Sequence, residues 1–196
     1  TQTTSPIVIS GLTNGIAYPV VIYASNSVGN GALSAAVTGT SSIIPTTLAT
    51  WNFTTNSVSP TNVPTNITIS DLVQGNNNGN TTILDASVAS SGYSGASGMY
   101  NAGAAARTGS LSTASSGSAY FEFTITPAAG CYFTLSTISF GSRCTNSGPQ
   151  AYTLRSSSDS YSSNLTSGSI SNNSIWSLKT NASINSNSTI GTPITY

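Results

Sequence analysis

The chain contains no histidine, and only 4% of its 196 residues are charged, against roughly 25% in ordinary soluble domains. The missing histidine removes the commonest general base, the Ser-His-Asp arrangement and most zinc sites. Four basic and four acidic residues balance, so the chain has no net charge to attract nucleic acid or an anionic membrane. No apolar run approaches the ~20 residues that cross a bilayer. We therefore expect neither nucleic-acid binding nor a membrane span.

Carboxylates are equally scarce, namely Asp71, Asp85, Glu122 and Asp159. Glycoside hydrolysis needs two facing carboxyl groups about 5 to 9.5 Å apart, and four scattered acids rarely converge in this way. The sequence therefore predicts a protein that is not an enzyme, with no catalytic residues and no bound cofactor. A calcium site that combines Asp71, Asp85 or Asp159 with backbone carbonyls stays open, although no carboxylate cluster marks a loop.

Only two cysteines are present, Cys131 and Cys144. If residues 131–144 formed one straight strand, the two sulfurs would lie roughly 40 Å apart and could not bond. A disulfide between them therefore requires a turn or a bulge. The alternatives are two buried thiols or a bridge to another chain.

Polarity comes instead from 67 Ser and Thr residues and 19 Asn residues. These side chains keep a surface hydrated without carrying charge. Near-zero net charge favours association between molecules. Such a surface suits an extracellular layer or fibre better than a crowded cytosol, so we expect an extracellular or cell-surface location. No leader is recognisable at the start, as expected for a chain whose leader has been removed or for a fragment.

Alternating apolar residues, separated by turn signals and without a helical period, predict an all-β chain of two domains. The first domain covers residues 1–40, with strands at 6–9, 18–24 and 32–37, and residues 41–49 form a linker. The second covers residues 50–196, with strands at 49–53, 66–69, 119–126, 132–140, 150–155 and 174–178.

Two finer features follow from the alternation in the second domain. Phe121, Phe123 and Ile125 are expected to face the core together, because residues two apart share a face of a strand. In strand 132–140 the alternation slips, which predicts a bulge near Ser136 and Thr137.

The stretch SPIVISGLTNGIAYPVVIYASNSVGNGALSAAV resembles the last three strands of a fibronectin type III domain. Leu12, Gly15 and Tyr18 match the family's tyrosine corner, in which the Tyr hydroxyl bonds the backbone a few residues upstream. Pro19 departs from the pattern, because it removes a ladder donor and so predicts an edge or a bulge. The resemblance implies a partial sandwich whose first four strands are absent.

Three stretches of the second domain, TWNF, AYFEFTITPAAGCYFTLSTISFGSR and SGPQAYTLRSSSDSY, resemble the jelly-roll-like β-sandwich domains of large secreted Bacteroidota surface proteins. The resemblance implies a jelly-roll-like antiparallel sandwich with a non-catalytic accessory or surface role. It also implies that a closing strand is lacking, since the chain stops at Thr195 and Tyr196 where that strand would begin.

A glycan-contact surface is a further candidate in the second domain. Planar guanidinium groups suit polar ligands, which favours Arg143 and Arg155 beside Tyr152. Aromatic rings can form a platform for sugars, and the candidates are Tyr93, Tyr100, Tyr152, Tyr161 and Trp176. Core packing is the alternative role for these rings, and it is the one that we favour.

Unpaired sheet edges at both ends of the chain lead to a structural hypothesis. Edges and half-covered apolar faces are unstable in water, so a neighbouring copy is expected to cover them by strand addition or close packing. Repeated head to tail, this contact gives a homo-oligomer or a surface filament. The alternatives are a carbohydrate-binding accessory module of a secreted enzyme, with a polysaccharide as its partner, and an adhesin stalk spacer.

Overall fold

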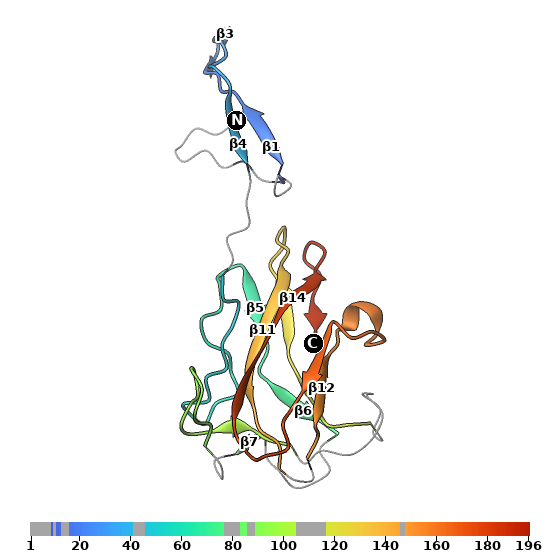
Figure 1. Ribbon diagram of the computed structural model, residues 1–196. Helices are drawn as coiled ribbons and strands as arrows, with labels where there is room; N and C mark the ends of the chain where they lie inside the picture. The colour runs from blue at the N-terminus through green and yellow to red at the C-terminus, as the bar shows by residue number, and fades with distance from the viewer. Residues whose placement is uncertain are drawn as a thin grey trace. The chain divides into compact units, whose positions relative to one another are not determined.

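The computed structural model describes residues 9, 11–12, 16–40, 46–76, 83–85, 89–104, 117–145 and 148–196. Their structure is all-β, as predicted, with antiparallel pairing throughout (Figure 1). In these residues no helix is long and apolar enough to cross a membrane. The chain divides into an N-terminal unit, Thr1–Thr46, and a C-terminal unit, Thr47–Tyr196.

A two-stranded ribbon, residues 17–40, forms the described part of the N-terminal unit. Strand β1 (Ala17–Val20) pairs with β4 (Val37–Thr40), and β2 (Ser25–Asn26) pairs with β3 (Gly29–Asn30). Between these pairs the backbone N–H of Ser34 donates to the carbonyl of Ile22 at 2.8 Å, which keeps the two arms together. We call residues 17–40 the N-terminal ribbon.

The turn of the ribbon lies where the sequence predicts it. The side-chain oxygen of Asn26 accepts hydrogen bonds from the N–H groups of Val28, at 2.9 Å, and Gly29, at 3.2 Å. Asn favours turns because its side chain bonds the backbone two residues on. Pro19 lies opposite Thr38 in β1, and β1 has β4 as its one strand partner among the described residues. This arrangement is what the prediction of an edge or a bulge at Pro19 leads one to expect, and the prediction itself stays open.

One sheet of the C-terminal unit has β10 (Thr124–Pro127) at its centre, between β5 (Ile67–Ile69) and β15 (Ile194–Thr195). Strand β6 (Val73–Gly75) pairs with β9 (Tyr120–Glu122) just beyond it. The hydroxyl of Ser70 accepts the N–H of Thr124 at 2.9 Å, which bridges the irregular step between the two pairings.

Three further strand pairs complete the unit. The longest joins β11 (Thr134–Ser142) to β14 (Ser177–Asn187). Strand β12 (Ala151–Leu154) pairs with β13 (Thr166–Ser169), and β7 (Leu84–Asp85) pairs with β8 (Asn101–Ala102). A single 3-10 turn among the described residues, η1 (Ser157–Asp159), follows β12.

The core joins the β15-β10-β5 sheet to the β11–β14 pair. Its buried members come from these two layers or flank them, and they are Ile125, Phe133, Leu135, Ile184, Ile194 and Tyr196. Ile125 and Ile184 are 1% and 2% exposed. Full burial of such a side chain stabilises the fold by about 1.5–3 kcal/mol, so these strands hold the unit together.

The slip in the alternation of β11 is the predicted bulge. Its register against β14 shifts between Leu135 and Thr137, which confirms the prediction. The prediction for Phe121 is wrong, because its side chain is 41% exposed and lies outside the core cluster. Phe123 instead packs against Trp51 and Tyr196, with ring centroids 4.8 and 5.6 Å away. Along this strand the core contacts extend to Phe123 and do not include Phe121. Alternation alone therefore could not predict that Phe121 is exposed.

Three strand glycines lie under tyrosine rings. A Cβ atom would overlap the ring of Tyr120 at Gly75, that of Tyr93 at Gly141 and that of Tyr152 at Gly168. Glycine weakens a strand because it has no side chain to pack. A ring laid over the glycine restores the missing contact.

The last residues of the chain form the edge strand of this sheet. Tyr196 and Phe123 exchange both backbone hydrogen bonds, at 2.9 and 3.1 Å, and β15 lies beside β10. The other side of β15 is occupied as well, because the N–H of Thr195 donates to the hydroxyl of Ser157 at 3.0 Å. Residues 194–195 are therefore already paired, and the lack of a further closing strand stays a prediction.

Candidate functional site

Both cysteines are free thiols. Cys131 precedes β11 and Cys144 follows it, and nine strand residues separate them. Nine residues span about 30 Å at ~3.3 Å per residue, and the bulge does not reverse the strand, so the internal disulfide is not formed. Cys144 is 3% exposed and donates to the carbonyl of Thr145 at 3.0 Å, whereas Cys131 is half-buried.

Tyr152 packs inside the C-terminal unit. Its ring meets Phe140 edge to face, with centroids 4.9 Å apart, and covers Gly168. Its hydroxyl and the amide group of Asn181 are linked by hydrogen bonds of 3.0 and 3.1 Å. Both the ring and the hydroxyl are thus engaged within the protein, which gives Tyr152 a packing role.

Arg155 and Tyr161 lie together near η1. The guanidinium of Arg155 donates to the side chain of Asn164 at 2.8 Å and to the carbonyl of Tyr161 at 2.9 Å. Burial is the largest cause that raises the pKa of Tyr161 above its ordinary value of 10.0, and the negative charge of Glu122 adds to it. A hydrogen bond from Thr195 lowers the pKa and partly offsets this rise. These contacts hold the chain after β12 in place.

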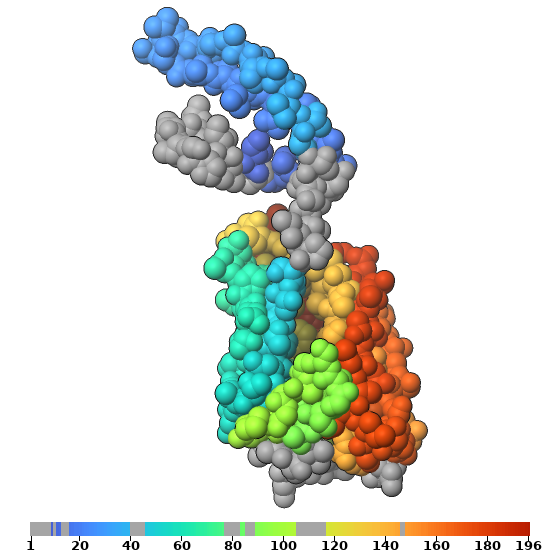
Figure 2. All heavy atoms as spheres, turned by 60° about the vertical axis from the view of Figure 1, so that its left-hand side comes forward, coloured from blue at the N-terminus to red at the C-terminus, as the bar shows by residue number. Residues whose placement is uncertain are grey.

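Arg143 directly follows the C-terminal end of β11. Trp176 directly precedes β14, near Tyr93. The Nε of Arg143 donates to the carbonyl of Ser174 at 2.7 Å. The rings of Tyr93 and Trp176 lie 6.5 Å apart between centroids, and Figure 2 shows the green segment that carries Tyr93 beside the orange-red β14. Among the seven glycan-contact candidates, Arg155 thus contacts Tyr161 and Tyr93 lies near Trp176, whereas a platform that unites all seven stays a prediction.

The tyrosine corner is described only in part. Tyr18 lies in β1 opposite Gly39, and both Tyr18 and Leu12 are half-buried. Gly15 lies outside the described residues, so the corner stays a prediction. Of the strand expected at residues 6–9, the structure describes Ile9 alone, so that strand stays a prediction as well.

The four acids come from different segments of the C-terminal unit. In the described ranges, no three His, Cys, Asp or Glu side chains gather closely enough to hold a metal ion. Asp71 is exposed, and Glu122 faces Val73 across the β6–β9 pair. Asp85 lies in β7 opposite Asn101. The calcium site considered from the sequence stays a prediction.

An apolar groove runs along one face of the N-terminal ribbon. Its volume is about 510 Å³, and it is lined by Val20, Ile22, Ser34, Ala35, Val37 and Gly39. Ile22 is 57% exposed and Val37 is 71% exposed. We call this feature the ribbon groove. Within the described part of the N-terminal unit, no side chain covers this apolar face.

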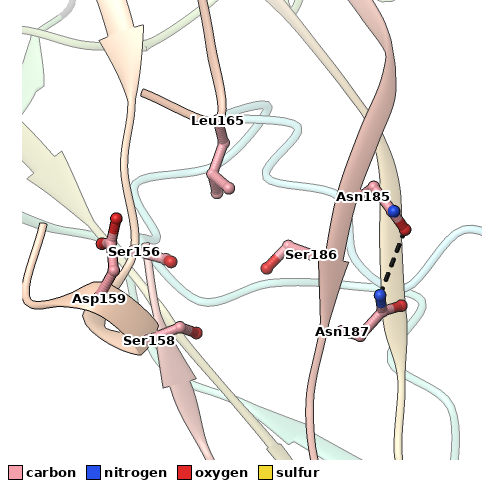
Figure 3. A pocket seen from close by; sticks show the side chains of 7 residues that line it. All are labelled: Ser156, Ser158, Asp159, Leu165, Asn185, Ser186 and Asn187. Carbon is pink, nitrogen blue, oxygen red and sulfur yellow. Dashed lines mark hydrogen bonds between the residues drawn. The ribbon is translucent and has the colours of Figure 1, made fainter. Parts of the chain in front are cut away.

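A second hollow, of about 290 Å³, lies between η1 and β14 (Figure 3). We call it the serine hollow, and its lining consists of Ser156, Ser158, Asp159, Leu165, Asn185, Ser186 and Asn187. Figure 3 shows the hydroxyls of Ser156 and Ser186 directed into it from opposite sides. The side chains of Asn185 and Asn187 lie beyond β14 and are joined by a 3.2 Å hydrogen bond.

Asp159 is the one charged residue in the lining of the serine hollow. Its two carboxylate oxygens accept the N–H groups of Ser162, at 3.2 Å, and Ser163, at 2.9 Å. Hydrogen bonds from Ser163 and then Ser162 hold the pKa of Asp159 below its ordinary value of 3.8, although desolvation opposes them. The carboxylate is therefore ionised at neutral pH. Sequence analysis missed this hollow, since serine is too common here to mark a site.

In comparisons with models of known families, with curated proteins and with solved structures, the chain matches none. The resemblances to fibronectin type III and jelly-roll-like domains therefore stay predictions that rest on the motifs quoted above.

Proposed function

We propose that the chain is a non-catalytic structural or adhesive protein that works outside the cell. Copies of it assemble into a surface filament, and the ribbon groove is the contact. The observation that carries this proposal is an open apolar groove on a two-stranded ribbon.

The groove is unfavourable in water. Apolar surface gains about 25 cal/mol for each Å² removed from water, and an isolated two-stranded hairpin is at best marginally stable. Val20 and Val37 are direct cross-strand partners in the groove, and Val37 is 71% exposed. A partner that covers these side chains would stabilise the ribbon as well as the contact.

Charge favours a second copy as that partner. The first 70 residues contain no charged side chain, and the whole chain is neutral. Two copies can therefore approach without repulsion, and few ions have to be desolvated. The low charge also supports a location outside the cell, where a weakly repelling surface serves a fibre or an adhesive layer.

Growth into a filament requires that the groove receive a different surface of the next copy, since a groove paired with itself closes a dimer. The C-terminal unit exposes apolar side chains that suit this role. Ile175 is 64% exposed and Ile190 is 67% exposed. By contrast, the edge strand β15 is already bonded on both sides, so strand addition there is disfavoured.

Sedimentation velocity of the full chain over a dilution series, together with negative-stain microscopy, tests the proposal. We expect long polymers that persist on dilution. A discrete monomer or dimer throughout the series would contradict a filament.

A further inference from the structure

We infer that the serine hollow binds a single neutral sugar residue, either free or at the end of a glycan. This inference is independent of the proposed assembly. It rests on one unpartnered hydroxyl, on the character of the opposite walls and on the charge of the lining.

Ser156 is the central observation. Its side chain is 2% exposed, yet its hydroxyl has no hydrogen-bond partner among the described residues. The hydroxyl oxygen is not fully enclosed by the protein, and it is directed into the hollow (Figure 3). The hydroxyl therefore reaches the space of the hollow, where it can donate to or accept from a polar atom of a bound molecule.

Ser186 supplies a second hydroxyl from the opposite wall. Its side chain is 5% exposed, and its hydroxyl is 2.7 Å from that of Tyr196, which fixes its position. A hydroxyl both donates and accepts, so one further bond stays available to it. Ser158 adds a third hydroxyl beside Ser156 (Figure 3). Groups that can each donate or accept match the hydroxyls of a polyol.

Leu165 gives the hollow an apolar wall, and its side chain is directed into the same space (Figure 3). A sugar ring presents C–H groups as well as hydroxyls, so a leucine among serines fits both. A volume of about 290 Å³ lies near the lower limit of ~300 Å³ for ligand pockets. The space therefore suits one ring rather than a chain of sugars.

Charge decides between a sugar and other small polar ligands. The lining carries the carboxylate of Asp159 and no cationic side chain, so an anion is disfavoured. Calcium takes six to eight oxygen ligands, and one carboxylate that already accepts two N–H groups is a poor start for such a site. Its remaining lone pairs can accept hydroxyl donors of a neutral sugar.

Equilibrium dialysis of the full chain against radiolabelled glucose, galactose and mannose, each taken separately, tests the inference. The method counts bound sugar whether or not the protein polymerises, so its outcome is separable from that of the assembly experiment. Glucuronate is the anionic comparison. The variants are Ser156→Ala and, as a matched control, Ser142→Ala, which removes another buried hydroxyl without a described partner, one that lies in β11 and outside this lining.

We expect saturable binding of at least one neutral sugar in the millimolar range, and weaker binding of glucuronate. Ser156→Ala should weaken sugar binding about fivefold, the equivalent of ~1 kcal/mol, and Ser142→Ala should leave it unchanged. Absence of saturable binding both of every free neutral sugar and of neutral oligosaccharides that end in these sugars would overturn the inference, as would equal binding by the Ser156→Ala variant. Binding of a terminal-sugar oligosaccharide alone would assign the site to glycan ends, whereas binding of the free sugar extends it to both sources.

Discussion

The backbone N–H of Thr195 donates a hydrogen bond to the hydroxyl of Ser157, 3.0 Å away. Strand β15 lies at the edge of its sheet, and this bond occupies an N–H on the side that β10 does not cover. Edge strands with free N–H groups invite pairing with other chains. The C-terminal unit thus protects this edge with its own residues, whereas the described residues of the N-terminal unit leave the ribbon groove uncovered.

Replacement of Ser157 by alanine should remove this protection. We expect the variant to lose about 1 kcal/mol of unfolding free energy, the usual net value of a hydrogen bond, as measured by urea denaturation. Ser158→Ala is the control, because the hydroxyl of Ser158 has no partner among the described residues. An equal loss in both variants would show that the bond to Thr195 does not stabilise the edge.

The contact between Tyr93 and Gly141 predicts a coupled pair of variants. Gly141→Ala should destabilise the fold by about 1–3 kcal/mol, because the new methyl group overlaps the ring of Tyr93. In a Tyr93→Ala background the same change should cost less, since the ring is gone. Four unfolding curves give the coupling energy, and strictly additive effects would contradict the ring-over-glycine contact.

The position of Tyr196 predicts a loss of stability in alkali. Burial raises the pKa of its hydroxyl above the ordinary value of 10.0, opposed by a hydrogen bond from Ser186. The folded state therefore keeps the proton longer than the unfolded state does. The stabilisation is complete below pH 10.0 and is lost as the pH rises from there through the folded-state pKa.

Denaturation at a series of pH values should show this loss, and Tyr196→Phe should reduce the slope above pH 10.0. Tyr161 has a raised pKa as well, so part of the slope should persist. Tyr132→Phe, at a ring that is 48% exposed, is the control. An unchanged slope in Tyr196→Phe would refute the assignment.

The two thiols should differ in reactivity. Cys131 is half-buried and Cys144 is 3% exposed, so a thiol reagent should label the first in the native protein and the second only after unfolding. Mass spectrometry of the intact chain counts the labels and identifies their positions. A chain two hydrogens lighter that takes no label would mean that the cysteines are joined after all.

Local patterns in the sequence predicted much of the fold. The turn at Asn26 and the bulge after Leu135 follow from turn chemistry and from a slip in the two-residue period. The exposure of Phe121 could not be predicted in this way, because alternation gives the face of a strand and not the extent of the core. Strand β14 is far longer than the expected strand 174–178, since its polar Ser and Asn residues carry no apolar period.

The candidate sites were harder to predict than the strands. Tyr152 and Trp176 have the residue types of a sugar platform, and only the fold shows that Tyr152 packs against Phe140 and Trp176 against Tyr93. Ser156 carries no signal in a chain with 67 Ser and Thr residues. Its role depends on burial without a partner, which is a property of the folded structure.

The central claim is that the ribbon groove binds a second copy, and sedimentation velocity of two charge variants tests it most directly. Val37→Asp places a carboxylate in the groove, whereas Thr38→Asp places the same charge on the next residue of β4, whose side chain points to the opposite face. We predict that Val37→Asp sediments as a monomer at concentrations where the unaltered chain and Thr38→Asp form polymers. Polymers of equal size in all three samples would contradict the account.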